Sequence, residues 1–264
     1  MNVKAFTRAA ALIALLGAAT AQAGTLTMSG TVRDFNAYGT TYNGVKGHVD
    51  FENKLGSEKG IVQSTLGADG KPVYNAATTH STVASANSFY QWYHDDATVN
   101  RSMAYSITLN QTSANTYQYS SNAFFPVDGL LLNQTAQGHN FGFTTELHSQ
   151  FVFDSSKKDT FSFSGDDDVW VFINGQLAID LGGVHTVETG KVDLNTFAAQ
   201  YGLLDGRAYT LDIFQAERHT TQSNFTITTS LRLGDTSTQV PEPASLALAG
   251  LGLAALATVR RRRR

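Results

Sequence analysis

The sequence predicts an all-β protein, an antiparallel β-sandwich with one short helix. Apolar and polar residues alternate along several segments, most clearly over 225–233, and this period of two is typical of a half-buried strand. Asn174-Gly175 separates two such segments, and both residues tolerate the positive φ of a type I′ hairpin turn. Helical spacing is found over 194–201, where Gly202 supplies a stop signal. Several strands with irregular loops and little helix indicate a sandwich.

The first 23 residues read as a secretory signal peptide. Lys4 and Arg8 form a basic start, and an apolar stretch over 9–19 follows. This stretch is too short to span a bilayer, and the small-residue sequence Ala21-Gln22-Ala23 is typical of a cleavage site. We therefore predict cleavage between Ala23 and Gly24; an uncleaved N-terminal membrane anchor is the alternative.

The mature body is predicted to be one β-rich domain, residues 24–233, because no repeat and no internal linker divides it. The expected strands lie around 105–109, 151–153, 160–164, 169–173, 176–181, 209–213 and 225–233. The small, polar residues 234–240 then look like a flexible linker.

Charge and composition restrict the classes of function. Between residues 24 and 240 the acidic residues outnumber the basic ones by nine, which argues against nucleic acid as a partner and suits a cation-binding surface. The chain has no cysteine, so disulfides and thiolate metal sites are excluded. No nucleophile motif of a hydrolase is present, and we predict no enzymatic activity.

The strongest chemical signal is the acidic turn Asp166-Asp167-Asp168, which lies between two predicted strands. Adjacent carboxylates repel one another unless a cation offsets them, and calcium prefers such hard oxygen ligands. In a regular strand neighbouring side chains point to opposite faces. A shared ion therefore requires, on this reasoning, a bulge or a cis peptide in the turn. The spacing of an EF-hand is absent, and a solvated acidic turn is the simpler alternative.

Residues 165–185, read as GDDDVWVFINGQLAIDLGGVH, strongly resemble the core of the fibro-slime domain. Further segments resemble the same family across about residues 29–233. They are GTVRDF (30–35), HVDFE (48–52), FFPVDG (124–129), HNFGFT (139–144), AERHTT (216–221) and SNF (223–225).

Fibro-slime domains are similar to the protective-antigen-type β-sandwich found in yeast flocculins and adhesins. This resemblance implies a calcium site whose paired aspartates, joined by a cis peptide, fall on Asp166 and Asp167. A second loop of those lectins supplies an asparagine ligand, for which Asn224 is the best match. Asp168 stands where glycine is frequent and is a possible further ligand. In the lectins, the calcium directly ligates sugar hydroxyls.

The loop that precedes Asn224 contains Glu217, Arg218 and His219. These are candidates for polar contact with a glycan at the rim of the site, and salt bridges that order the loop are an equally weighted alternative. Trp92 is a candidate for stacking on a sugar ring, although we favour core packing for this residue.

The C-terminus, residues 241–264, combines Pro241-Glu242-Pro243, a 16-residue apolar run and five arginines. These three parts, in this order, resemble the PEP-CTERM sorting signal. The resemblance implies a transient transmembrane helix in the inner membrane, cleavage by an exosortase, and a location on the cell surface or in the extracellular matrix.

The sequence thus predicts a secreted or surface-associated binding module with calcium as cofactor. Its predicted partner is extracellular polysaccharide or a cell-surface glycan, in matrix or biofilm adhesion. The alternative is a structural matrix protein whose calcium only stabilises the fold.

Overall fold

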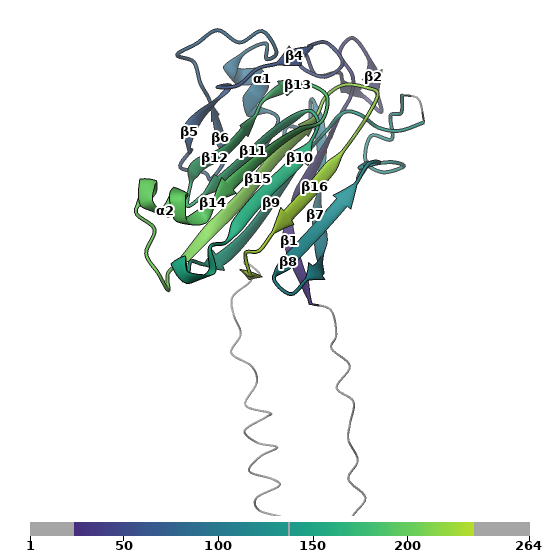
Figure 1. Ribbon diagram of the computed structural model, residues 1–264. Helices are drawn as coiled ribbons and strands as arrows, with labels where there is room; N and C mark the ends of the chain where they lie inside the picture. Colours follow the sequence, from purple (N-terminus) through teal and green to yellow (C-terminus); the bar gives the residue numbers. More distant parts are fainter. Residues whose placement is uncertain (1–23, 137, 235–264) are drawn as a thin grey trace, which may run out of the picture.

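The computed structural model describes residues 24–136 and 138–234, and these form a mostly antiparallel β-structure with few helices (Figure 1). The predicted all-β antiparallel sandwich is therefore confirmed. The long strands are β1 (Thr25–Phe35), β7 (Asn100–Ser113), β8 (Thr116–Ser121), β9 (Phe143–Val152), β10 (Thr160–Gly165), β11 (Asp168–Ile173), β12 (Gln176–Leu181), β14 (Glu188–Asp193), β15 (Ala208–Glu217) and β16 (Phe225–Thr229). The short ones are β2 (Thr41–Tyr42), β3 (Val45–Lys46), β4 (Gly56–Ser57), β5 (Val62–Leu66), β6 (Pro72–Tyr74), β13 (Gly183–Val184) and β17 (Leu233–Gly234).

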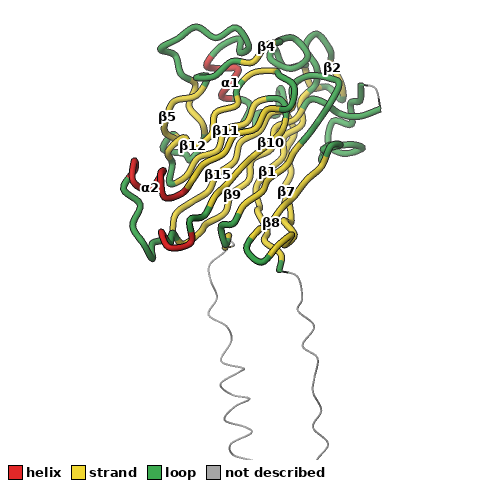
Figure 2. The backbone as a smooth tube through the Cα atoms, viewed as in Figure 1, coloured by secondary structure: helices red, strands yellow, loops and turns green. Residues whose placement is uncertain are grey.

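Two α-helices and one 3₁₀ turn accompany the strands in the described part of the chain, as Figure 2 shows. Helix α2 (Leu194–Tyr201) is the predicted one; Asp193 caps its start and Gly202, at φ 73°, ends it. Helix α1 (Ala86–Tyr90) was not predicted, and a 3₁₀ turn covers Ser155–Lys157.

The main sheet curls around one large apolar core. Its strand order is β14-β10-β16-β8-β7-β1-β9-β15-β11-β12-β5-β6, with β17 beside β9. Strand β14 packs against β12, and this contact closes the sheet on itself. Gly190 of β14 lies so near Ile179 of β12 that a Cβ at Gly190 would come within 2.3 Å of the isoleucine Cγ2. One apolar cluster is shared by strands from both halves of the sheet, which makes the arrangement a sandwich.

Strand β11 is buried on both faces. Val169 and Val171 point into the main core, whereas Trp170 and Phe172 belong to a second apolar cluster. Alternating side chains point to opposite faces of a strand, so the second cluster lies on the other side of the sheet. Residues of the segment 35–93, which includes α1, cover that side.

The β11–β12 hairpin has the predicted turn, with φ 50° at Asn174 and 72° at Gly175. The strand predicted over 225–233 is interrupted instead. It ends at Thr229, Ser230 donates its backbone N–H to the Thr160 carbonyl, and pairing resumes at Leu233 beside β9.

The described ends of the chain lie together at one end of the sandwich (Figure 1). Leu233 pairs with Phe151, whereas Glu217 pairs with Phe143 at the opposite end of β9; a strand of this length spans roughly 30 Å. Among the described residues, none forms a helix long and apolar enough to cross a membrane. The predicted signal peptide, most of the linker and the sorting signal lie outside the described residues.

A buried charge network fixes the turn between β5 and β6 onto β9. Glu146 accepts hydrogen bonds from Arg33 (2.9 Å), His148 (2.8 Å) and Lys71 of that turn. The other nitrogen of His148 lies 2.7 Å from Asp212. Burial alone would lower the pKa of His148, but the two carboxylates raise it to about 9.

This network predicts a loss of stability at alkaline pH. The pKa of His148 is about 9 in the folded chain and has its ordinary value of 6.5 in the unfolded chain. Its contribution to the free energy of unfolding is therefore full below about pH 6.5 and is lost as the pH rises through 9. We expect the free energy of unfolding to fall by roughly 2 kcal/mol more in wild type than in His148→Gln between pH 7 and 10. Urea unfolding at several pH values measures this difference, and parallel curves would contradict it.

Candidate functional site

The acidic turn lies where the chain crosses from one part of the sheet to another. Strand β10, before the turn, pairs with β14 and β16, whereas β11, after it, pairs with β12 and β15. Asp166 and Asp167 occupy the crossing itself. Gly165 allows a close approach there, because a Cβ at this position would lie 2.5 Å from the Asn224 carbonyl oxygen.

In place of the predicted distortion within a strand, the chain crosses at this turn from one part of the sheet to another. Every peptide bond in residues 24–136 and 138–234 is trans, and no β-bulge is needed, because Asp166 and Asp167 are outside regular strands. The expectation of a bulge or a cis peptide was wrong for this structure. The rule that neighbouring side chains point apart applies to a regular strand, and the chain leaves one at Gly165.

Asp166 and Asn224, two of the predicted calcium ligands, are hydrogen-bonded to each other. Asn224 donates its backbone N–H to Asp166 Oδ1 and its side-chain Nδ2 to Asp166 Oδ2, the latter at 2.8 Å. The predicted pair thus meets across the ends of β10 and β16, with the amide nitrogen of Asn224 facing the carboxylate.

Asp167 and Asp168 have different hydrogen-bond partners. Asp167 accepts backbone N–H bonds from His185 (3.2 Å) and Arg218 (2.9 Å). Asp168 is fully buried; it accepts the Gly183 N–H at 2.6 Å and pairs with Arg218 Nε at 2.6 Å. Both oxygens of Asp168 are thereby committed inside the protein, so the structure does not support Asp168 as a further calcium ligand.

Arg218 is at the centre of a buried arrangement. Its side chain is fully buried and donates to the backbone carbonyls of Thr82 (2.7 Å) and Asp50 (3.2 Å). Its guanidinium carbon lies 4.5 Å from the centroid of the Trp92 ring, within the range of a cation–π contact. The Trp92 Nε1 in turn donates to Asp50 Oδ2 at 3.1 Å.

Three of the predicted glycan contacts are therefore corrected. Glu217, Arg218 and Trp92 are each fully buried, and a ligand at the surface does not reach them in this structure. For Arg218 the alternative of a salt bridge that orders the loop is the correct one. For Trp92 the favoured core packing is correct.

Glu217 adds a further buried acid beside the turn. Neither of its carboxylate oxygens has a hydrogen-bond partner among the described residues, and the neighbouring Ser223 hydroxyl donates to the Phe124 carbonyl. Burial, reinforced by Asp167 and Asp166, raises the pKa of Glu217 well above its ordinary range. Burial also raises the pKa of Asp167, despite the nearby Arg218. The site therefore holds more acidic groups than it can keep ionised without a counter-charge.

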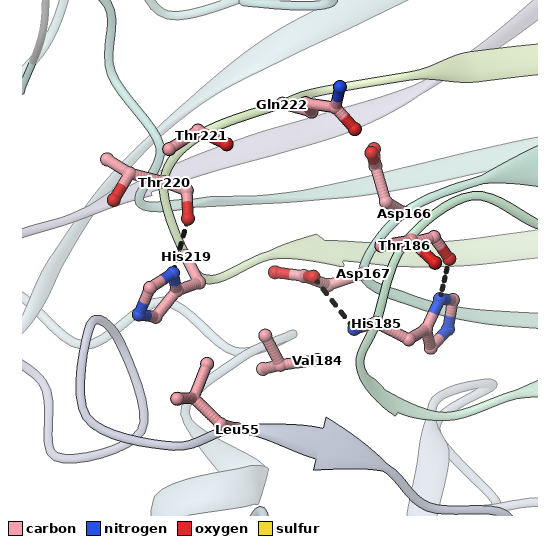
Figure 3. Close-up of a pocket in the computed structure, with 10 residues that line it drawn as sticks. All are labelled: Leu55, Asp166, Asp167, Val184, His185, Thr186, His219, Thr220, Thr221 and Gln222. Atoms are coloured by element: carbon pink, nitrogen blue, oxygen red, sulfur yellow. Dashed lines mark hydrogen bonds between the residues drawn. The ribbon is translucent and has the colours of Figure 1, made fainter.

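A surface hollow of about 230 Å³ opens above the acidic turn. Figure 3 shows Asp166 and Asp167 on its wall, with the loop 219–222 on one side and His185 and Thr186 on another. Of the predicted rim residues His219 lines it, with its Nδ1 beside the Thr220 carbonyl and its side chain 30% exposed. His185 was missed by the sequence analysis, although it ends the segment that carries the family resemblance.

This arrangement is suited to binding a cation at carboxylate oxygens in a partly enclosed hollow. Hard oxygen donors and a shortage of positive charge favour a cation such as Ca²⁺. The described residues contain no group of three or more acidic or histidine side chains already assembled as a metal site. Any bound cation would therefore need other oxygens, from amide groups, the backbone, water or a ligand.

Comparisons with known families agree with the fold and with the C-terminal motif. Residues 128–244, which contain both the acidic turn and Asn224, match the PA14 domain family. A PEP-CTERM protein-sorting motif is found over residues 239–264. The finer identification as a fibro-slime domain stays a prediction. The sorting motif indicates export and targeting to the surface or the extracellular space, and it implies processing by an exosortase.

Several curated relatives come from Dictyostelium discoideum. Protein psiQ is 42% identical over 67% of this chain and 19% of its own length. Protein psiD is 39% identical over 69% of this chain and 38% of its own. The chain therefore spans well under half of these relatives. Among solved structures, the PA14 domain of the MpAFP antifreeze protein is matched at 11% identity and a TM-score of 0.27, over 80% of this chain and 84% of that one.

The burial of Arg218 predicts a structural role. Arg218→Ala should lower the free energy of unfolding by about 3–5 kcal/mol, because it leaves the Asp168 carboxylate buried without its counter-charge. Arg218→Lys should recover only part of this, since lysine lacks the planar fork that serves Asp168 and two carbonyls together. Urea unfolding measures both losses. His219→Ala, in the exposed part of the same loop, is the control and should cost less than 1 kcal/mol; equal losses would contradict the assignment.

Proposed function

We propose that the protein is a calcium-dependent carbohydrate-binding module that acts outside the cell in matrix or biofilm adhesion. PA14 domains are associated with carbohydrate binding and adhesion, and the observation that supports this role here is the position of Asp166 and Asp167 on the wall of a surface hollow. The proposed role is binding rather than catalysis. Its proposed ligand is extracellular polysaccharide or a cell-surface glycan.

The proposed cation would be held by Asp166, Asp167 and Asn224. Asn224 now donates its Nδ2 to Asp166, and half a turn of the amide would offer its oxygen instead. The buried Glu217 beside the two aspartates has a strongly raised pKa and so keeps its proton, and a divalent cation nearby would lower that pKa and favour the ionised carboxylate. Calcium takes 6–8 oxygen ligands, so these side chains leave positions for water or sugar hydroxyls.

The residues around the hollow would then select the sugar. His219 and Thr220 come from the loop after β15, and His185 and Thr186 from the loop after β13. Their exposed polar groups can contact hydroxyls that the cation does not ligate. Because the body of the chain is acidic, we expect a neutral glycan, or an acidic one bridged by calcium.

The position of the hollow fits a protein held at its C-terminus. The end of β15 that leads into the hollow lies opposite the end where β17 leaves the sandwich (Figure 1). A chain exported through the inner membrane and processed at Pro241-Glu242-Pro243 would present the hollow away from its point of attachment.

The first test of this proposal is calcium binding. Calcium should raise the melting temperature of wild type, with a gain of about 2.7 kcal/mol at a hundred times the dissociation constant. Asp166→Asn and Asp167→Asn should each abolish the rise, because each removes a charged ligand. Asp205→Asn, an exposed aspartate outside the hollow, is the control and should keep it. Thermal melts of each variant with calcium and with chelator decide the matter; an equal rise in all four proteins places the site elsewhere.

The second test is sugar recognition. Binding to a glycan array should disappear with chelator and return with calcium. His219→Ala should keep the calcium-dependent melting shift and weaken glycan binding several-fold, because the imidazole is at the rim and is not a proposed ligand. A protein that binds calcium but no glycan on the array would support the structural alternative, in which the cation only stabilises the fold.

A further inference from the structure

A second hollow lies between the β5–β6 turn and helix α1. It has a volume of about 490 Å³ and shares no residue with the hollow above the acidic turn. Pro72, Val73, Ala86 and Phe89 line it with apolar surface. A volume of several hundred Å³, mostly apolar lining and a few polar groups are typical of small-ligand sites.

An aromatic platform forms one wall of this second hollow. The ring of Tyr90 is stacked on His94, with centroids 3.6 Å apart and planes 10° from parallel, and Tyr90 is 56% exposed. His94 is fixed at both nitrogens, since Nδ1 lies 2.7 Å from the Tyr90 carbonyl and Nε2 lies 2.9 Å from Asp69 Oδ2. The tyrosine ring is thus held in place and remains open to solvent, which reduces the side-chain entropy that a ligand would have to remove.

A carboxylate lies at the rim next to this platform. Asp69 accepts one hydrogen bond at each oxygen, from the Lys71 N–H (3.1 Å) and from His94. Each carboxylate oxygen can accept two, and the Asp69 side chain is 50% exposed. Spare acceptor positions therefore face solvent beside the exposed ring of Tyr90.

These features select among ligand classes. A wholly apolar ligand would cover Asp69 without supplying donors, which is costly for a carboxylate. An anion would meet Asp69 directly. A cation gains little, because the Asp69 carboxylate is half exposed to water and an ion pair at such a surface position contributes little free energy. A neutral sugar complements all of the groups, since a pyranose has an apolar C–H face for the aromatic ring and hydroxyl donors for the carboxylate.

We propose that this second hollow binds a neutral sugar residue without calcium, with the sugar's C–H face on Tyr90 and its hydroxyls donating to Asp69. The site is independent of the acidic turn. Two sites on one chain would allow a polysaccharide to be held at two points, which raises avidity without any new contact.

The test uses the mature chain in the presence of EDTA, with cellohexaose, laminarihexaose and maltohexaose as probes and isothermal titration calorimetry as the readout. At least one probe should bind wild type. Tyr90→Ala should weaken that binding at least tenfold, because it removes the platform, and Asp69→Asn should weaken it several-fold. Tyr90→Phe is the matched control that keeps the ring, and its affinity should stay within threefold of wild type. Thermal melts confirm that each variant is folded.

Asp166→Asn distinguishes this inference from the proposed function and should leave the EDTA-resistant binding unchanged. If no probe binds wild type in EDTA, or if Tyr90→Ala binds as wild type does, the second site is refuted, while a calcium-dependent glycan site can still stand. If binding in EDTA depends on Tyr90 and calcium has no effect on the protein, the second site is supported and the calcium-dependent function is refuted.

Discussion

The buried ion pair between Asp168 and Arg218 is the interaction on which the rest of the site depends. Arg218 follows β15 directly, and its guanidinium connects the start of β11 with the carbonyls of Asp50 and Thr82 in the covering segment. One side chain thereby joins the sandwich to the layer that covers its second core. Breaking a buried pair leaves an uncompensated charge, so the loop after β15 cannot move away from the acidic turn without a large cost in free energy.

Much of the sandwich could be predicted from the sequence, because a strand with one buried face shows a period of two and the Asn174-Gly175 turn has a distinctive backbone requirement. The covering segment could not. Helix α1 has only five residues, too few to show a helical period, and its sequence signal is a capping box of two serines, Ser85 and Ser88. The second core is built mainly from loops around such short elements, which leave no regular hydrophobic pattern.

The acidic turn was predictable in its residues but not in its geometry. Three consecutive aspartates are conspicuous in any sequence, yet nothing local shows that the chain crosses between parts of the sheet at Asp166-Asp167. The burial of Arg218 could not be predicted either, for a different reason. Arginine is almost never fully buried unless it is paired, and its partner Asp168 is fifty residues away in the chain.

These contacts give the acidic residues of the site different roles. Asp168 is fully used inside the protein, whereas Asp166 and Asp167 keep their carboxylates on the wall of the hollow. Glu217 is buried, has no hydrogen-bond partner in the described chain and keeps its proton because its pKa is strongly raised, so it would add negative charge only once a cation is bound nearby. A cation at the hollow would thus be attracted by several acids yet directly ligated by few. Such a cation has incomplete coordination from the protein, and this shortage is what would couple its binding to that of an oxygen-rich ligand.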